Sequence, residues 1–166
     1  KKIFLDIDIV RLFLLHINLL SPFLIFLCLK EVFGKNDKFL NKKMLLLSFA
    51  ILISPSFRAN IIWPESITLG FLFFLIALLF FLKNQNSFEK KNIFLNIFFV
   101  AIASYIRPSF CLFAIFFAFN FIFLIKNNKI TLIKDKKLIL QIIVFNFLLA
   151  SPAIYYVFGL DVFFIE

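Results

Sequence analysis

Long apolar blocks, separated by short gaps rich in lysine and asparagine, constrain the fold of this chain more than any other feature of its sequence. The blocks run for about 14 to 21 residues, close to the length of helix that crosses a hydrocarbon layer of about 30 Å. Of 166 residues, 63% are hydrophobic and 29 are phenylalanine, and the mean hydropathy is +1.05. A soluble domain of this size could not bury so much apolar surface. The sequence therefore predicts an integral membrane protein.

The length and composition of the blocks predict an all-α chain that forms one transmembrane domain, a polytopic bundle of about six helices over residues 1–166. The expected helices span residues 9–29, 44–57, 64–82, 93–106, 109–125 and 138–158. The chain begins with Lys1 rather than methionine, and no signal peptide can be made out. We therefore expect it to be an internal fragment of a longer protein.

The basic residues are concentrated in alternate gaps between the blocks. Residues 30–43, 83–91 and 126–137 hold thirteen of the 18 lysines and arginines. The positive-inside rule places these three loops in the cytoplasm, which fits the inner (plasma) membrane of a bacterium. Because the lysines lie in the gaps and not along one helical face, the net charge of +9 is a topology signal and does not predict nucleic-acid binding.

The opposite ends of the helices should carry the polar features of the outer face. The predicted helices 44–57 and 93–106 contain about 14 residues and are roughly 21 Å long, shorter than the hydrocarbon layer. Each helix that runs outward ends in a proline step, at Ser54-Pro55, Arg107-Pro108 and Ser151-Pro152. Proline frees backbone groups that lipid cannot satisfy, so three such breaks favour a water-filled cavity. Ordinary helix ends at the membrane interface are the equal alternative.

Arg58 and Arg107 are the strongest candidates for a functional site, because each lies beside a proline break on the expected outer side. A guanidinium in a membrane is costly unless it faces a partner or water, and its planar fork suits phosphate oxygens. We interpret both as binding the phosphate of a lipid. The alternative is that each side chain extends to the lipid headgroups.

Three neighbours of these arginines could line the same pocket. Glu65 follows Pro64 at the start of a predicted helix, where capping or pairing with Arg58 is a simpler role than catalysis. Trp63 and Tyr105 are typical of residues that anchor a helix at the interface.

The remaining polar residues favour structural roles. Asp6 and Asp8 form an Asp-x-Asp that could hold a divalent cation, but the pattern is common by chance and we assign no metal ligand. His16 and Asn18, inside the first helix, are expected to form hydrogen bonds between helices. The two cysteines, Cys28 and Cys111, fall at opposite ends of their helices and should not form a disulfide.

Several stretches together resemble a known family. They are VRLFLLHINLL at 10–20, KEVFGK at 30–35, the Ser-Pro step with Pro64 and Glu65, and ASYIRPS at 103–109. This combination resembles the middle of the GT-C type polytopic glycosyltransferases, such as the protein-mannosyltransferase and lipid A aminoarabinose transferase group.

The resemblance implies an enzyme that takes a sugar from a polyprenyl-phosphate carrier. It would transfer that sugar to a lipid, glycan or protein acceptor on the non-cytoplasmic face. In that family the catalytic acid lies in the first outer loop, which would precede Lys1, and Arg58 and Arg107 would bind the leaving phosphate. A non-catalytic or transporting membrane protein, of the lipid-linked glycan flippase or polymerase type, is the alternative.

Overall fold

The computed structural model describes residues 7–34, 38–62, 66–127 and 132–159, and all regular secondary structure in these ranges is helical. The prediction of an all-α fold is confirmed for this part of the chain. In chain order the helices are α1 (Ile7–Asn18), α2 (Ser21–Phe33), α3 (Lys38–Phe49), η1 (Ala50–Ile53), α4 (Pro55–Ile62), α5 (Ser66–Asn86), α6 (Lys90–Ile106), η2 (Pro108–Phe110), α7 (Cys111–Asn127) and α8 (Leu132–Gly159).

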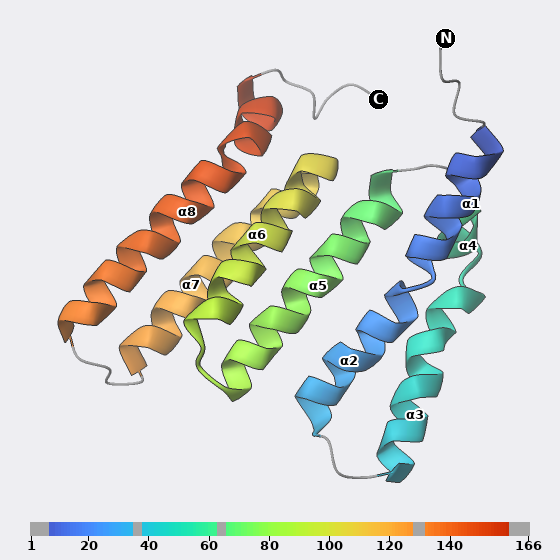
Figure 1. The fold of residues 1–166 in the computed structure, drawn as a ribbon, viewed down its shortest axis with the longest axis horizontal. Coiled ribbons are helices and arrows are strands. Elements are labelled where there is room, and N and C mark those ends of the chain that lie inside the picture. Colours follow the sequence, from blue (N-terminus) through green and yellow to red (C-terminus); the bar gives the residue numbers. More distant parts are fainter. Residues whose placement is uncertain (1–6, 35–37, 63–65, 128–131, 160–166) are drawn as a thin grey trace.

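The long helices lie side by side (Figure 1). α5 packs against α6 on one side and α2 on the other, and α3 packs against α2. α6, α7 and α8 contact one another, and the short α4 packs against α1 and the start of α5. α5 therefore joins the first four helices to the last three.

Among the residues that the structure describes, three segments are long and apolar enough to cross a membrane: Arg11–Phe33, Thr68–Asn86 and Pro108–Ile125. This supports an integral membrane protein with three candidate spans, compared with about six predicted from the sequence. α3 and α6, with 12 and 17 residues, are shorter than the roughly 20 residues of an untilted span.

The predicted helix 9–29 is two helices in the structure, with a turn at Leu19 and Leu20 between α1 and α2. Pro22 stands at the second position of α2, where its missing N–H removes the bond that would continue α1. The prediction treated this proline as part of a continuous span. Within a helix, proline removes the hydrogen bond to the carbonyl four residues earlier, which here is that of Asn18.

The predicted helix 44–57 also differs from the structure. α3 begins six residues earlier, at Lys38, and ends at Phe49. A 3₁₀ turn, Ala50–Ile53, follows, and then the extended residue Ser54. Because the residue before proline resists helical geometry, Ser54 separates this turn from α4. The remaining predictions agree with α5, α6, α7 and α8 to within a few residues, except that α8 starts at Leu132.

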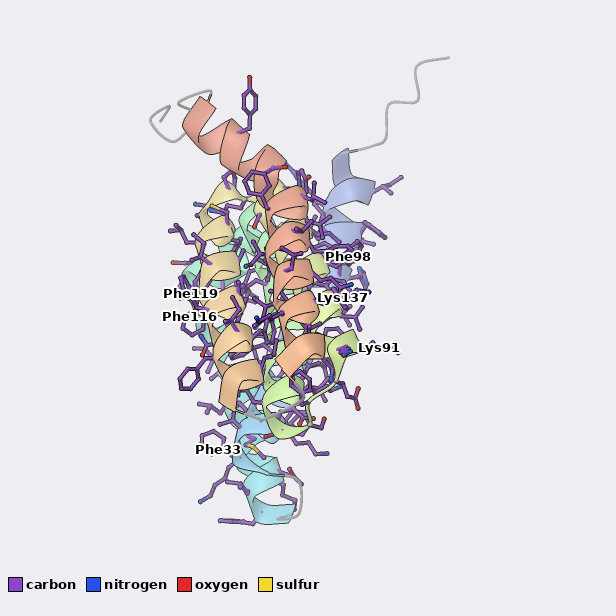
Figure 2. The ribbon with its side chains drawn as sticks, turned by 90° about the vertical axis from the view of Figure 1, so that its left-hand side faces the viewer. Phe33, Lys91, Phe98, Phe116, Phe119 and Lys137 are labelled. Atoms are coloured by element: carbon purple, nitrogen blue, oxygen red, sulfur yellow. The ribbon has the colours of Figure 1, made fainter. Side chains whose placement is uncertain are left out.

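The core lies among α5, α6, α7 and α8. Aromatic rings fill its centre, with the centroid of Phe81 on α5 4.8 Å from that of Phe117 and 5.5 Å from that of Phe121, both on α7. The buried core residues are Ala77, Phe81, Ile93, Ile97, Val100, Ala114, Phe117, Phe121, Ile125, Leu138 and Ile142. By contrast, Phe116 and Phe119 point away from the bundle on the outer side of α7 (Figure 2). Such an apolar exterior suits contact with lipid.

Candidate functional site

The two arginine-bearing proline junctions lie at the same end of the bundle, opposite the Lys-rich connections. Figure 1 shows the C-terminal ends of α2, α5 and α7 and the starts of α3, α6 and α8 together at one end. The η1–α4 junction and the C-terminal end of α6 lie toward the other end (Figure 1). The separation of charge along the sequence is therefore a separation in space.

The first junction turns on Ser54, which is extended with φ −61° and ψ 120°. Pro55 opens α4, and the hydroxyl of Ser54 accepts a bond from the Phe57 N–H at 3.4 Å. The Ser54 carbonyl accepts the Arg58 N–H at 3.1 Å. Ser54 thus accepts two N–H groups in the first turn of α4. The Arg58 side chain is exposed.

The second junction turns on Arg107, which ends α6 in extended geometry with φ −140° and ψ 109°. Its N–H donates to the Ala103 carbonyl at 2.8 Å, and its carbonyl accepts the Phe110 N–H at 3.1 Å. Pro108 then starts the short η2 turn into α7. Arg107 is half-buried, whereas Arg58 is exposed.

A glycine on α5 allows the second junction to approach closely. A Cβ at Gly70 would lie 3.0 Å from Phe110 Cε2 and 3.5 Å from Arg107 Cβ. Phe110 also stacks on Phe74 of α5, with their centroids 5.3 Å apart. These contacts fix the backbone that carries Arg107 against the first half of α5.

The two arginines belong to separate parts of this end. In Figure 1, α5 lies between α4, which carries Arg58, and the C-terminal end of α6, which carries Arg107. Tyr105, two residues before Arg107, is 53% exposed. Trp63, Glu65 and Asp6 lie outside the described residues, and only the backbone of Asp8, in α1, is described.

The third predicted break, at Ser151-Pro152, is not a break: α8 continues through it to Gly159. Within a helix, Pro152 would leave the Leu148 carbonyl without its usual donor. The hydroxyl of Ser151 donates to that carbonyl at 3.0 Å. The side chain thus supplies a donor to the carbonyl that Pro152 cannot reach.

A line of polar contacts between α1–α2 and α5 was not predicted as a unit. Asn18 Nδ2 donates to Thr68 Oγ1 at 3.0 Å, which confirms the expected helix-to-helix role of Asn18. His16, in contrast, is exposed and bonds the Leu12 carbonyl of its own helix. Further along, the free thiol of Cys28 lies 3.7 Å from the Leu75 carbonyl, and Asn86 Nδ2 donates to Glu31 Oε2 at 3.1 Å.

We call these three contacts the polar seam. The sequence contains a pattern that could have indicated the polar seam. The polar residues Asn18, Ser21, Cys28 and Glu31 follow one another at spacings of three and seven residues. Such spacings place side chains on one face of a helix. Polar groups on one face of an apolar helix indicate contact with another helix.

A polar cavity of about 470 Å³ lies at the Lys-rich end of the seam. Its lining comes from the end of α2, the α5–α6 turn and the start of α6, and comprises Glu31, Lys83, Asn86, Ser87, Glu89 and Asn92. Within the described ranges, no group of three or more histidine, cysteine, aspartate or glutamate side chains could hold a metal ion. Hydrogen bonds from Asn86 and Asn92 already engage both glutamates.

Comparisons of the chain with models of protein families, with curated proteins and with solved structures find no match. The functional argument therefore depends on the residues and geometry of this chain.

Proposed function

We propose that this chain is part of a polytopic GT-C type glycosyltransferase of about six transmembrane helices. It acts in the inner membrane of a bacterium and uses a polyprenyl-phosphate-linked sugar as donor. The end of the bundle with the proline junctions faces away from the cytoplasm and receives the phosphate of the carrier. The acceptor is a lipid, glycan or protein on that side.

The observation that carries the proposal is the position of Arg107. It is a half-buried arginine on extended backbone at the end of an apolar helix, and the C-terminal ends of α2, α5 and α7 lie at the opposite end of the bundle. A permanent positive charge in an apolar setting is retained where it has an anionic partner. A lipid phosphate supplies both the anion and an apolar tail that fits the bundle exterior.

The chemistry that the arginine would contribute is electrostatic. When a sugar leaves its carrier, negative charge grows on the phosphate oxygens. A guanidinium held in place near those oxygens stabilises that charge without having to reorganise, and its two parallel N–H groups fit two oxygens. Exposed Arg58, beyond α5, would make a weaker, more hydrated contact with the same class of headgroup.

The test compares Arg107→Ala with Lys137→Ala in the full-length protein, assayed in proteoliposomes with a polyprenyl-phosphate sugar. Lys137 is an exposed lysine of α8, near the Lys-rich end, and its replacement removes the same charge. We expect Arg107→Ala to lower the rate of transfer on the order of 100-fold, as does loss of one preorganised donor in an active site. Lys137→Ala should retain the wild-type rate. Equal rates in the two variants would remove Arg107 from the mechanism.

Binding and orientation are tested separately. Arg107→Ala should weaken retention of polyprenyl phosphate in native mass spectrometry, while Arg107→Lys should restore part of it because charge is kept and the planar fork is lost. Arg58→Cys and Arg107→Cys should react with a charged thiol reagent added from the outside. Labelling only from the cytoplasmic side would show that the orientation is reversed. Retained lipid binding with no transfer by the full-length protein would instead favour a lipid-linked glycan transporter.

A further inference from the structure

The turn between α1 and α2 interrupts a candidate span, Arg11–Phe33, near its middle. Pro22 carries no N–H for the carbonyl of Asn18, four residues earlier. Broken backbone at this depth is tolerated where protein or water satisfies the freed groups, because lipid cannot.

Two side-chain oxygens at this turn are buried and have no hydrogen-bond partner. They are Asn18 Oδ1 and Ser21 Oγ. Each of these residues is only 1% exposed. In the structure Asn18 Nδ2 donates to Thr68 Oγ1 at 3.0 Å, which leaves Oδ1 as the amide atom without a partner. A buried polar atom without a partner is destabilising, so two of them on residues three apart point to a bound molecule.

The chemistry of the turn selects a neutral hydrogen-bond donor. Asn18 Oδ1 can only accept, and the Ser21 hydroxyl can accept or donate. Asn18, Ser21 and Thr68 bring no negative charge to balance a cation.

We propose that the α1–α2 turn binds one internal water molecule. The water donates one proton to Asn18 Oδ1 and accepts a hydrogen bond from the Ser21 hydroxyl. Its other proton is available to the Asn18 carbonyl. Internal waters typically make about three such bonds, and this one satisfies the two buried side-chain oxygens at the turn. The site is independent of the proposed phosphate site, because it lies inside a span and not at the proline junctions.

The experiment is proton-detected NMR of the whole chain, isotope-labelled and placed in lipid nanodiscs. We expect cross-peaks between water and the Asn18 side-chain amide and the Ser21 N–H, although both residues are buried within a span. Ser21→Ala removes one of the three partners and should lower the Asn18 cross-peak about twofold or more, because a less tightly held water exchanges faster. Ser21→Ala leaves the Asn18–Thr68 bond in place, so the fold should persist.

Ser104→Ala is the matched control. Ser104 is also fully buried in an apolar helix, but its hydroxyl donates to the Val100 carbonyl at 2.8 Å. Its replacement should leave the Asn18 cross-peak unchanged. Absence of water cross-peaks at Asn18 and Ser21 in the unmodified chain would overturn the proposal. So would their loss when sodium chloride replaces choline chloride, because that result would identify a cation site.

Discussion

The helices α5 to α8 pack around buried phenylalanine, isoleucine and leucine side chains, whereas α1 and α2 meet α5 through hydrogen bonds. Phe121 and Ile142 represent the first kind of contact, and both are 0% exposed. The Asn18–Thr68 and Glu31–Asn86 contacts represent the second. α5 takes part in both, because Ala77 and Phe81 belong to the core while Thr68 and Asn86 belong to the polar seam.

The difference matters because lipid tails are as apolar as the side chains of the helices. Burying an apolar side chain between helices in a bilayer gains close packing but little transfer free energy. A hydrogen bond gains little in total as well, since unfolded helices in the membrane also find partners. We therefore compare the loss in the free energy of unfolding when one side chain is replaced. For a core side chain we expect a larger total loss than for a side chain of the polar seam, but a smaller loss for each atom removed.

The largest effect is expected from Phe121→Ala. The ring lies between α5 and α7 with its centroid 5.5 Å from that of Phe81, and its removal opens a cavity that the neighbours cannot close. We expect the free energy of unfolding in bicelles to fall by about 3 kcal/mol, the lower end for such replacements in soluble cores. Phe119→Ala is the control, because that ring is 70% exposed on the same helix. Equal losses for the two would show that α7 packs with its other face inward.

The sequence predicts the packed half well for a physical reason. Apolar blocks bounded by lysines mark where a helix can lie in lipid, and Arg107-Pro108 correctly marks the end of α6. Ser151-Pro152 looks the same in sequence, yet α8 continues there. In α8 the hydroxyl of Ser151 donates to the Leu148 carbonyl, whereas at Ser54-Pro55 the serine is extended and its hydroxyl accepts the Phe57 N–H. A serine before proline is therefore compatible with a continuous helix and with a broken one.

The seam and the arginine positions are harder to predict. A hydrogen bond between helices requires a partner 47 to 55 residues away, and helix periodicity alone does not say which helices are neighbours. The sequence correctly placed Arg58 and Arg107 beside proline junctions. It did not show that α5 would lie between them, because that separation depends on how α4 packs against α1.

The next effect is expected at the α5–η2 contact, where the packed half reaches the candidate site. Gly70→Leu adds a side chain whose Cβ alone would lie 3.0 Å from Phe110 Cε2. We expect a loss of about 2 kcal/mol from overpacking and a smaller loss for Gly70→Ala, for which only the Phe110 ring must shift. Urea or SDS titration of the purified variants measures both. A neutral Gly70→Leu would mean that η2 is free to move away from α5.

A double-mutant cycle on Asn18→Leu and Thr68→Val measures the seam directly. The two side chains are buried and bonded at 3.0 Å. We expect a coupling energy of about 0.6–1.7 kcal/mol, the range found for hydrogen bonds between membrane helices. A coupling near zero would indicate that packing, and not the hydrogen bond, holds α1 beside α5.

The smallest effect is expected from Asn86→Ala, at the exposed end of the seam. Asn86 Nδ2 donates to both the carbonyl and Oε2 of Glu31, at 2.9 and 3.1 Å, and so links α5 to α2. Water can replace both bonds at an exposed site, so we expect a loss of only about 0.5 kcal/mol. Ser87→Ala is the control, because the Ser87 hydroxyl bonds the Lys83 carbonyl within its own segment and does not reach α2. Spin-label distances between the ends of α2 and α5 should broaden in Asn86→Ala and not in Ser87→Ala. If both distributions stayed narrow, the end of α2 would be held by contacts other than this pair of hydrogen bonds, and the seam would stop at Cys28.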